Sequence, residues 1–288
     1  MTLVNMKELI TQAEQKGVGV GAFNVANMEM IIGVVKASEE TDTPVIMQIA
    51  EGRLPYSPLH IIGPAMVAAA KVSKTEIAVH LDHGRSMKTI RQALDIGFTS
   101  VMYDGSSMPY SGNVRRTKEA VSIAAEYGAA VECEIGIVGG NEGGDYVHKI
   151  KHTNPMDAMQ FSRATGADAM AVAIGNAHGV YTSEPELRFD ILRQIREKSA
   201  LPLVLHGGSG ITDDDFQEAI RCGIRKVNIA TASFINTVAF AKNYLDTTVK
   251  PDYFGMSDAM VCGTFENVKR HIMIFNTANN NRTLVTGE

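Results

Sequence analysis

Eight short apolar runs, separated by longer stretches with helix-capping residues, constrain this 288-residue chain more than any other feature. Most of the runs are continuously apolar rather than alternating, which is typical of strands buried on both faces of a parallel sheet. They lie at residues 18–25, 44–50, 77–82, 100–104, 129–136, 169–175, 201–207 and 226–230. Eight strand-then-helix units in one chain predict the α/β class and a single (β/α)8 barrel, the TIM barrel.

Helix-capping residues support the intervals between these runs. Asn154 before Pro155 predicts a helix that begins at the proline. Ser183 and Thr212 each precede an acidic residue by three positions, a capping-box spacing that predicts two more helix starts. No linker divides the chain, so we expect one barrel domain over residues 1–276. The polar segment 277–288 lacks apolar periodicity and is expected to be a flexible tail.

Composition excludes several classes of function. The net charge of −5 and the dispersed lysines and arginines argue against nucleic-acid binding and against a polybasic membrane patch. Three cysteines without a CxxC pair indicate neither a disulfide framework nor a cysteine zinc site. The N-terminal sequence lacks the plan of a signal peptide, and no apolar run is long enough to span a membrane. We expect a soluble cytoplasmic protein.

Polar residues gather at the predicted strand ends, where TIM-barrel active sites lie. A lone histidine there is usually only a polar residue at the rim of the sheet. Three of the eight histidines, however, lie at strand ends, each directly before a glycine. These are His83, His178 and His206, and a catalytic zinc takes three protein ligands with one position left open. The strand-end residues are Asn24, Asp82, His83, Asp104, Glu134, His178, His206, Asn228 and Thr231.

Two loops near the end of the barrel indicate a phosphate site. "LHGGSGIT" (205–212) and "KVNIATAS" (226–233) follow the seventh and eighth predicted strands. In this fold those loops commonly hold a phosphate through backbone N–H groups and a helix N-terminus. Glycine also serves ordinary tight turns, so the place of the loops in the barrel carries the argument. The site is therefore expected to hold a divalent metal beside a phosphate.

A glycine-rich segment follows the fifth predicted strand. It has four glycines between residues 139 and 144 and contains Glu142. Such a segment is expected to serve as a lid that carries this glutamate. A solvated loop with an incidental glutamate is the alternative.

Six motifs in order give the chain a family resemblance. "HLDHG", "YDGS", "ECEIGIVGG", "GNAHG", "LHGGSG" and "KVNIAT" resemble the class II, zinc-dependent ketose-bisphosphate aldolases of the fructose- and tagatose-bisphosphate type. The resemblance implies that His83, His178 and His206 bind Zn²⁺, and that Asp82 is the acid/base. It also implies that Asp104 and Glu134 lie close to the metal, and that Glu142 moves a proton at C3 of the substrate.

The same resemblance implies a substrate pocket, a second ion and an assembly. A monovalent cation (Na⁺ or K⁺) is implied near the phosphate, and a homodimer or homotetramer is expected. Asn228 is implied on the hydroxyls of the dihydroxyacetone-phosphate half, and Asn24 at the distal end of the substrate. The residues implied around the dihydroxyacetone-phosphate end are Gly179, Gly207, Gly208, Ser209, Ala230 and Thr231.

The implied chemistry is physically consistent with these residues. Retro-aldol cleavage leaves negative charge on an enediolate, which a zinc Lewis acid stabilises. Asp82, adjacent to the ligand His83, takes the proton of the C4 hydroxyl as the C3–C4 bond breaks. The expected reaction is the reversible cleavage of a fructose- or tagatose-type ketose 1,6-bisphosphate to dihydroxyacetone phosphate and an aldehyde such as glyceraldehyde 3-phosphate.

The sequence departs from the family pattern where the aldehyde half binds. Ala50 stands where a serine is common, and Val261 stands where an arginine often reaches the distal phosphate. Ala230 resembles the tagatose branch, and Arg53 is a candidate replacement for the lost phosphate contact. A ketose 1-phosphate with a modified aldehyde half is therefore an alternative substrate. An epimerase or isomerase with the same enediolate competes with the aldolase interpretation, as does a non-catalytic barrel subunit of a sugar-pathway enzyme.

Overall fold

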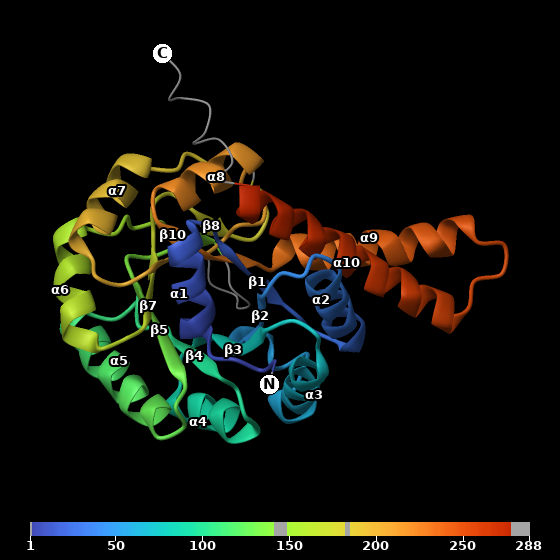
Figure 1. Ribbon diagram of the computed structural model, residues 1–288, viewed down its shortest axis with the longest axis horizontal. Helices are drawn as coiled ribbons and strands as arrows, with labels where there is room; N and C mark the ends of the chain where they lie inside the picture. The colour runs from blue at the N-terminus through green and yellow to red at the C-terminus, as the bar shows by residue number, and fades with distance from the viewer. Residues whose placement is uncertain (1, 141–148, 182–184, 278–288) are drawn as a thin grey trace, which may run out of the picture.

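Eight parallel strands form a closed barrel in the computed structural model, which describes residues 2–140, 149–181 and 185–277 (Figure 1). Around the barrel the order is β1-β10-β9-β7-β5-β4-β3-β2, and β2 pairs with β1. The predicted α/β barrel and all eight predicted strands are confirmed. The barrel strands are β1 (Val20–Asn24), β2 (Val45–Ala50), β3 (Ile77–Gly84), β4 (Ser100–Tyr103), β5 (Ala130–Ile135), β7 (Ala169–Val172), β9 (Leu203–Leu205) and β10 (Ile224–Ile229).

Helices surround the barrel. Two very short strands, β6 (Gly139–Gly140) and β8 (Ala177–His178), pair with each other in a separate sheet. The α-helices are α1 (Met6–Lys16), α2 (Met28–Glu40), α3 (Leu59–Val72), α4 (Met87–Ile96), α5 (Tyr110–Ala125), α6 (Pro155–Thr165), α7 (Phe189–Lys198), α8 (Asp213–Arg221), α9 (Thr231–Thr247) and α10 (Tyr253–Thr277). A short 3-10 helix, η1 (Glu51–Arg53), follows β2.

Two of the three predicted helix caps are confirmed. The Asn154 side chain accepts N–H donation at the start of α6, and the Thr212 side chain accepts from Asp215 at the start of α8. The cap predicted at Ser183 is wrong, because α7 begins only at Phe189, and Ser183 itself lies outside the described residues. Residues 185–188, directly before α7, are not helical. The spacing of a capping box alone therefore did not locate this helix.

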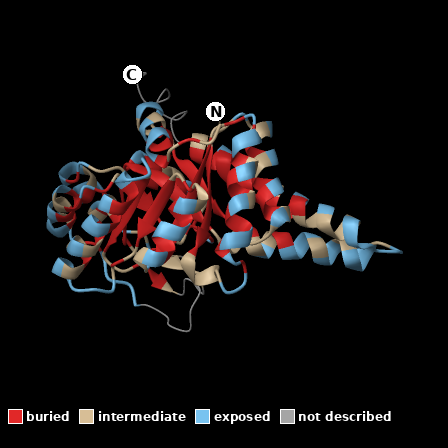
Figure 2. Cartoon of the chain, turned by 90° about the horizontal axis from the view of Figure 1, so that it is seen from below, coloured by how far each residue is buried: buried red, intermediate tan, exposed pale blue. Residues whose placement is uncertain are grey.

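Buried apolar side chains form two separate clusters, one between the strands and the outer helices and one inside the barrel. In Figure 2 the barrel strands are mostly buried, whereas the outer faces of the helices are exposed. The inner region joins the apolar face of α1 to small residues of the strands, so α1 closes the N-terminal end of the barrel. Because side chains alternate along a strand, the residue two positions after each of these apolar residues also points into the barrel interior. There the interior becomes polar, with Gln48, His80, Glu132 and Lys226 all fully buried.

Helices α9 and α10 pack against each other and extend well beyond the barrel on one side (Figure 1). Their exposed side chains include Val238, Leu245 and Phe254. Val261 is buried in α10 where this helix packs on α2, and its carbonyl lies close to Gly33. No helix within the described part of the chain is both long enough and apolar enough to cross a membrane.

Candidate active site

His83 lies at the C-terminal end of β3, and its backbone is left-handed, with φ of 45°. This conformation is uncommon for a residue with a side chain. The pairing of β3 with β4 shifts register between Leu81 and Gly84, so the chain turns at His83 itself. Gly84, the next residue, has a different role. A Cβ on Gly84 would lie 2.4 Å from the carbonyl oxygen of Met102, so glycine is needed there for close approach to β4.

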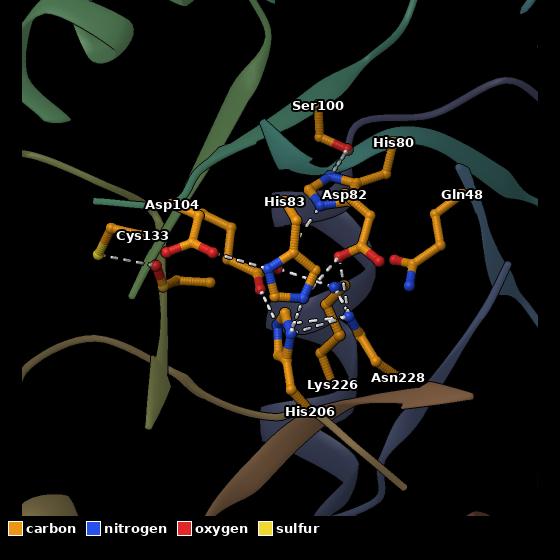
Figure 3. Close-up of polar contacts among 12 residues, drawn as sticks. Gln48, His80, Asp82, His83, Ser100, Asp104, Cys133, His206, Lys226 and Asn228 are labelled. Atoms are coloured by element: carbon orange, nitrogen blue, oxygen red, sulfur yellow. Dashed lines mark hydrogen bonds and ion pairs between the residues drawn. The ribbon is translucent and has the colours of Figure 1, made fainter. Parts of the chain in front are cut away.

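Three histidines from three different segments meet at this end of the barrel. His83 comes from β3, His178 from β8, and His206 directly follows β9. One ring nitrogen from each of the three lies within 4.8 Å of the other two. His83 Nε2 and His206 Nδ1 are only 2.8 Å apart (Figure 3). The structure thus brings the three predicted metal ligands together.

Two carboxylates set the proton positions on these rings. His83 Nδ1 is 2.9 Å from Asp104 Oδ2, and His206 Nε2 is 2.7 Å from Glu132 Oε1. An ionised carboxylate only accepts hydrogen bonds, so these two ring nitrogens donate. In the neutral rings, His83 Nε2 and His206 Nδ1 then carry lone pairs that face each other. Two facing lone pairs repel unless a shared proton or a metal ion binds to them, so the donor set fits a divalent metal such as zinc.

A second group of residues that could hold a metal combines His83 with two carboxylates, Asp104 and Glu134. One ligand atom from each of the three lies within 4.8 Å of the other two. Burial, with added repulsion from Asp104, raises the pKa of Glu134 to about 8. Burial opposes ionisation of Asp104 as well, but hydrogen bonds from His83 and Ser106 hold the pKa of that carboxyl below its usual range. A cation here would favour the ionised form of both carboxylates.

Asp82 is clamped beside the histidines by two amides. Asn24 Nδ2 donates to one carboxylate oxygen at 3.0 Å, and Asn228 Nδ2 donates to the other, also at 3.0 Å. Gln48 in turn donates to the side-chain oxygen of Asn24 at 2.8 Å. Asp82 Oδ1 is 3.9 Å from His83 Nε2, so a carboxylate is held next to the candidate metal ligands. Such a fixed carboxylate can exchange a proton with a substrate bound there.

One cavity is lined by all the residues predicted around the dihydroxyacetone-phosphate half, and also by Asn24, which is predicted at the distal end. Next to it begins α9, and the Ser209 hydroxyl accepts a hydrogen bond from the N–H of Ala232 in the first turn of that helix. Free N–H groups and the positive end of the helix dipole favour an anion at such a helix start. The residues that line the cavity are Asn24, Asp82, His178, Gly179, Gly207, Gly208, Ser209, Asn228, Ala230 and Thr231.

The other residues considered for the aldehyde end do not line this cavity. The Arg53 guanidinium lies over the ring of Phe234 in α9, 5.8 Å from the ring centroid. Ala50 is buried at the end of β2, opposite Asp82 of β3, whereas Val261 packs against α2. Glu142 lies outside the described residues. A neighbouring cavity, which shares His178 with the first, is lined by His83, Arg85, Ser106 and Ser107, among others.

Three buried polar residues below the histidines were not predicted as site residues. Lys226 Nζ is 2.8 Å from Glu132 Oε2 and donates to Asn228 Oδ1 at 2.7 Å. Burial disfavours the charged form of Glu132, but Lys226 and His206 together hold the pKa of its carboxyl well below the usual range. His80 bonds to Ser100 Oγ at 2.9 Å, and burial with Lys226 nearby lowers its pKa to about 3, so it is neutral.

Comparison with known proteins identifies the family of this chain. Residues 4–280 match the family described as Fructose-bisphosphate aldolase class-II. The chain is 39% identical over 249 residues to the fructose-bisphosphate aldolase of Staphylococcus aureus (strain Mu50 / ATCC 700699), with 85% of this chain and 86% of the relative covered. It is 37% identical over 258 residues to the probable fructose-bisphosphate aldolase of Bacillus subtilis (strain 168), with 88% and 90% covered.

Solved structures give the same result. The crystal structure of the YdjI aldolase from Escherichia coli K12 superposes with a TM-score of 0.86 at 32% identity, covering 96% of this chain and 99% of that one. A putative fructose-1,6-bisphosphate aldolase from Coccidioides immitis also superposes with a TM-score of 0.86, at 25% identity, covering 97% and 99%. The chain therefore belongs to the class II fructose-bisphosphate aldolase family, and it is a lyase of the aldolase type.

Proposed function

We propose that this enzyme uses a divalent metal, zinc, to catalyse the reversible cleavage of a ketose 1,6-bisphosphate of the fructose or tagatose type. The products are dihydroxyacetone phosphate and an aldehyde such as glyceraldehyde 3-phosphate. The observation that carries the proposal is the convergence of His83, His178 and His206 beside the clamped carboxylate of Asp82. A metal held by the three histidines would act as a Lewis acid that stabilises the negative charge left by carbon–carbon cleavage.

Asp82 is proposed as the acid/base of the reaction. Its carboxylate would accept the proton of the C4 hydroxyl as the C3–C4 bond breaks and return that proton in the reverse direction. The side chains of Asn24 and Asn228 are neutral amides, so they hold the carboxylate by hydrogen bonds and not by pairing it with a positive charge. In this proposal Asp104 and Glu134 assist the metal site, and Glu142 moves the proton at C3.

The phosphate of the dihydroxyacetone-phosphate half is proposed to bind at the start of α9. Gly207, Gly208, Ser209, Ala230 and Thr231 line the cavity there together with Gly179. A Cβ on Gly207 would lie 2.3 Å from the carbonyl oxygen of Ala177, so only glycine fits this part of the cradle. Backbone carbonyls of the same loops are the proposed ligands of a Na⁺ or K⁺ ion.

The aldehyde half is the less supported part of the substrate. Among the described residues that line the substrate cavity there is no lysine or arginine to hold a second phosphate. A ketose 1-phosphate is therefore the alternative substrate, whereas a bisphosphate would need Arg53, turned away from Phe234, or Arg85 of the neighbouring cavity to meet its second phosphate.

One experiment tests both the proposed metal and the proposed substrate. Zinc in the purified enzyme is measured, and release of dihydroxyacetone phosphate is followed with a coupled assay. The panel contains fructose 1,6-bisphosphate, tagatose 1,6-bisphosphate and the matching ketose 1-phosphates. Cleavage of a bisphosphate at least tenfold faster than of its 1-phosphate would support the first form, and the reverse order would support the alternative. Bound zinc without cleavage of any member would refute the proposed substrate class.

We also propose that the enzyme is a homodimer or homotetramer. The projecting pair α9–α10 exposes several large apolar side chains, among them Val238, Leu245, Tyr253 and Phe254. Exposed apolar surface of this kind is typical of protein contacts. Light scattering of the purified protein would test the proposal, and a mass of one chain, 31.1 kDa, would refute it.

A further inference from the structure

Glu132 and Lys226 form an ion pair in the interior of the barrel, with both side chains fully buried. Removing two charges from water is costly, and an apolar pair of the same size is often at least as stable. The barrel interior one step below is filled by alanines and other apolar residues, so the fold itself has no need of charges here. The pair therefore needs an explanation other than packing.

Glu132 determines which nitrogen of His206 faces the candidate metal site. Its Oε1 accepts from His206 Nε2 at 2.7 Å, which leaves the lone pair of Nδ1 directed at His83. Without this acceptor the neutral ring can carry its proton on Nδ1, and that nitrogen could not bind a cation. Glu132 contacts no part of the substrate cavity, so it acts through His206.

Lys226 connects the same carboxylate to the clamp around Asp82. Its ammonium group donates to Asn228 Oδ1 at 2.7 Å, and a lysine ammonium has no acceptor. The amide of Asn228 is therefore oriented with its oxygen toward Lys226 and its Nδ2 toward Asp82. If the amide were reversed, its oxygen would face the carboxylate of Asp82, and the two groups would repel.

We infer that Glu132 and Lys226 are a positioning pair that sets the tautomer of His206 and the amide orientation of Asn228 together. One buried ion pair would thus orient both a candidate metal ligand and the acid/base clamp. The inference rests on the metal site of the proposed function. It adds two residues that touch neither the substrate cavity nor the metal.

Two double variants distinguish the loss of the hydrogen-bond acceptor for His206 from the loss of the buried charges. Glu132→Leu with Lys226→Met removes both charges and the acceptor for His206. Glu132→Gln with Lys226→Met also removes both charges but keeps an oxygen that can accept from His206 Nε2. Zinc affinity is measured by competition with a chelator, and folding by urea denaturation. Loss of a supporting hydrogen bond to a metal ligand typically weakens metal binding about 10- to 100-fold.

We expect the leucine–methionine variant to fold but to bind zinc about 10- to 100-fold more weakly than wild type. The glutamine–methionine variant should bind zinc within about threefold of wild type, yet turn over about tenfold more slowly because the amide of Asn228 is no longer oriented. Zinc affinities equal to wild type in both variants, or equally weak in both, would overturn the inference.

A measurement on the unmodified protein covers the case in which the variants do not fold. Nitrogen-15 NMR of the histidines in the metal-free wild type, assigned with a His206→Gln sample, reports the tautomer directly. A proton on Nε2 of His206 supports the inference, and a proton on Nδ1 overturns it. A wild-type protein without zinc affinity would defeat the proposed function as well. Zinc binding with cleavage by the wild type, but the wrong tautomer, would defeat only the inference.

Discussion

The lower and upper halves of the barrel interior are built on the same strands but have opposite chemistry. The lower half is apolar and small, and the helix α1 closes it with Met6, Leu9 and Ile10. The upper half, one inward-facing position further along most of the strands, holds buried carboxylates, amides, imidazoles and a lysine. On β3, for example, Ala78 belongs to the lower half, whereas His80 and Asp82 belong to the upper one.

This contrast shows how the enzyme separates stability from chemistry. Apolar packing at the N-terminal end supports the closed barrel, and the polar groups at the C-terminal end are held by hydrogen bonds to one another. The division is a general property of the fold, since TIM-barrel sites lie at the C-terminal ends of the strands. Substitutions in the two halves should therefore have separable consequences.

The largest effect is expected from removal of a metal ligand in the upper half. His83→Ala should abolish zinc binding and cleavage together, because two ligands remain and Asp104 loses its hydrogen-bond partner. Metal analysis and the coupled assay, run on the same preparation, check this. A His60→Ala variant, changed at an exposed position of α3, is the matched control and should retain both. Full zinc occupancy in His83→Ala would exclude the assigned ligand set.

Asp82→Asn should lower turnover without removing the metal. The clamp residues and the histidines remain, so zinc should still bind, but an amide cannot accept the C4 proton. Turnover is expected to fall by about 10²- to 10⁴-fold. The ratio of zinc to protein and the turnover number measured together check this. Loss of zinc from a variant that remains folded would show that Asp82 belongs to the metal site rather than to proton transfer.

A substitution in the lower half should change stability and leave the chemistry alone. Leu9 is almost fully buried in the α1 closure, so Leu9→Ala should lower the free energy of unfolding by about 2–5 kcal/mol. Urea unfolding measures this, and the activity of the folded fraction should equal that of wild type. Gln15→Ala, exposed on the same helix, serves as the control. Equal losses of turnover and stability in Leu9→Ala would show that the two halves are not separable.

The smallest effect is expected from a histidine outside the barrel. His271 in α10 packs among Phe23, Phe216 and Phe275, and burial lowers its pKa to about 4. Between about pH 6.5 and pH 4 the unfolded chain takes up a proton there that the folded chain does not. Stability therefore falls with falling pH, by on the order of 2 kcal/mol. Urea unfolding of wild type and His271→Phe at pH 7 and pH 4.5 should show a smaller acid loss in the variant.

Much of this arrangement could be predicted from residue patterns. Continuous apolar runs identified the eight strands, and residues at their ends identified His83, His178, His206 and Asp82 as neighbours. Closure of a barrel brings all strand ends to one rim, so no knowledge of side-chain contacts was needed. The glycine-rich loops likewise predicted the cavity at the start of α9.

The buried pair below the site could not be predicted in the same way. Glu132 and Lys226 lie inside strands, and only the closed barrel places them 2.8 Å apart. A signal existed, because Glu132 precedes Glu134 by two residues and Lys226 precedes Asn228 by two, which puts each couple on one face of its strand. The left-handed backbone at His83 had no signal, since histidine before glycine suggests that the glycine turns.

The clamp on Asp82 has a consequence for the whole barrel. Asn24 comes from β1, the first barrel strand, and Asn228 comes from β10, the last, and these two strands are paired along the seam that closes the cylinder. Asp82, the proposed acid/base, is therefore held across the junction of the first and last barrel strands. The histidines lie on segments in between. With Asp82 as the proposed acid/base, a loosened β1–β10 junction should lower turnover before it weakens metal binding at the three histidines.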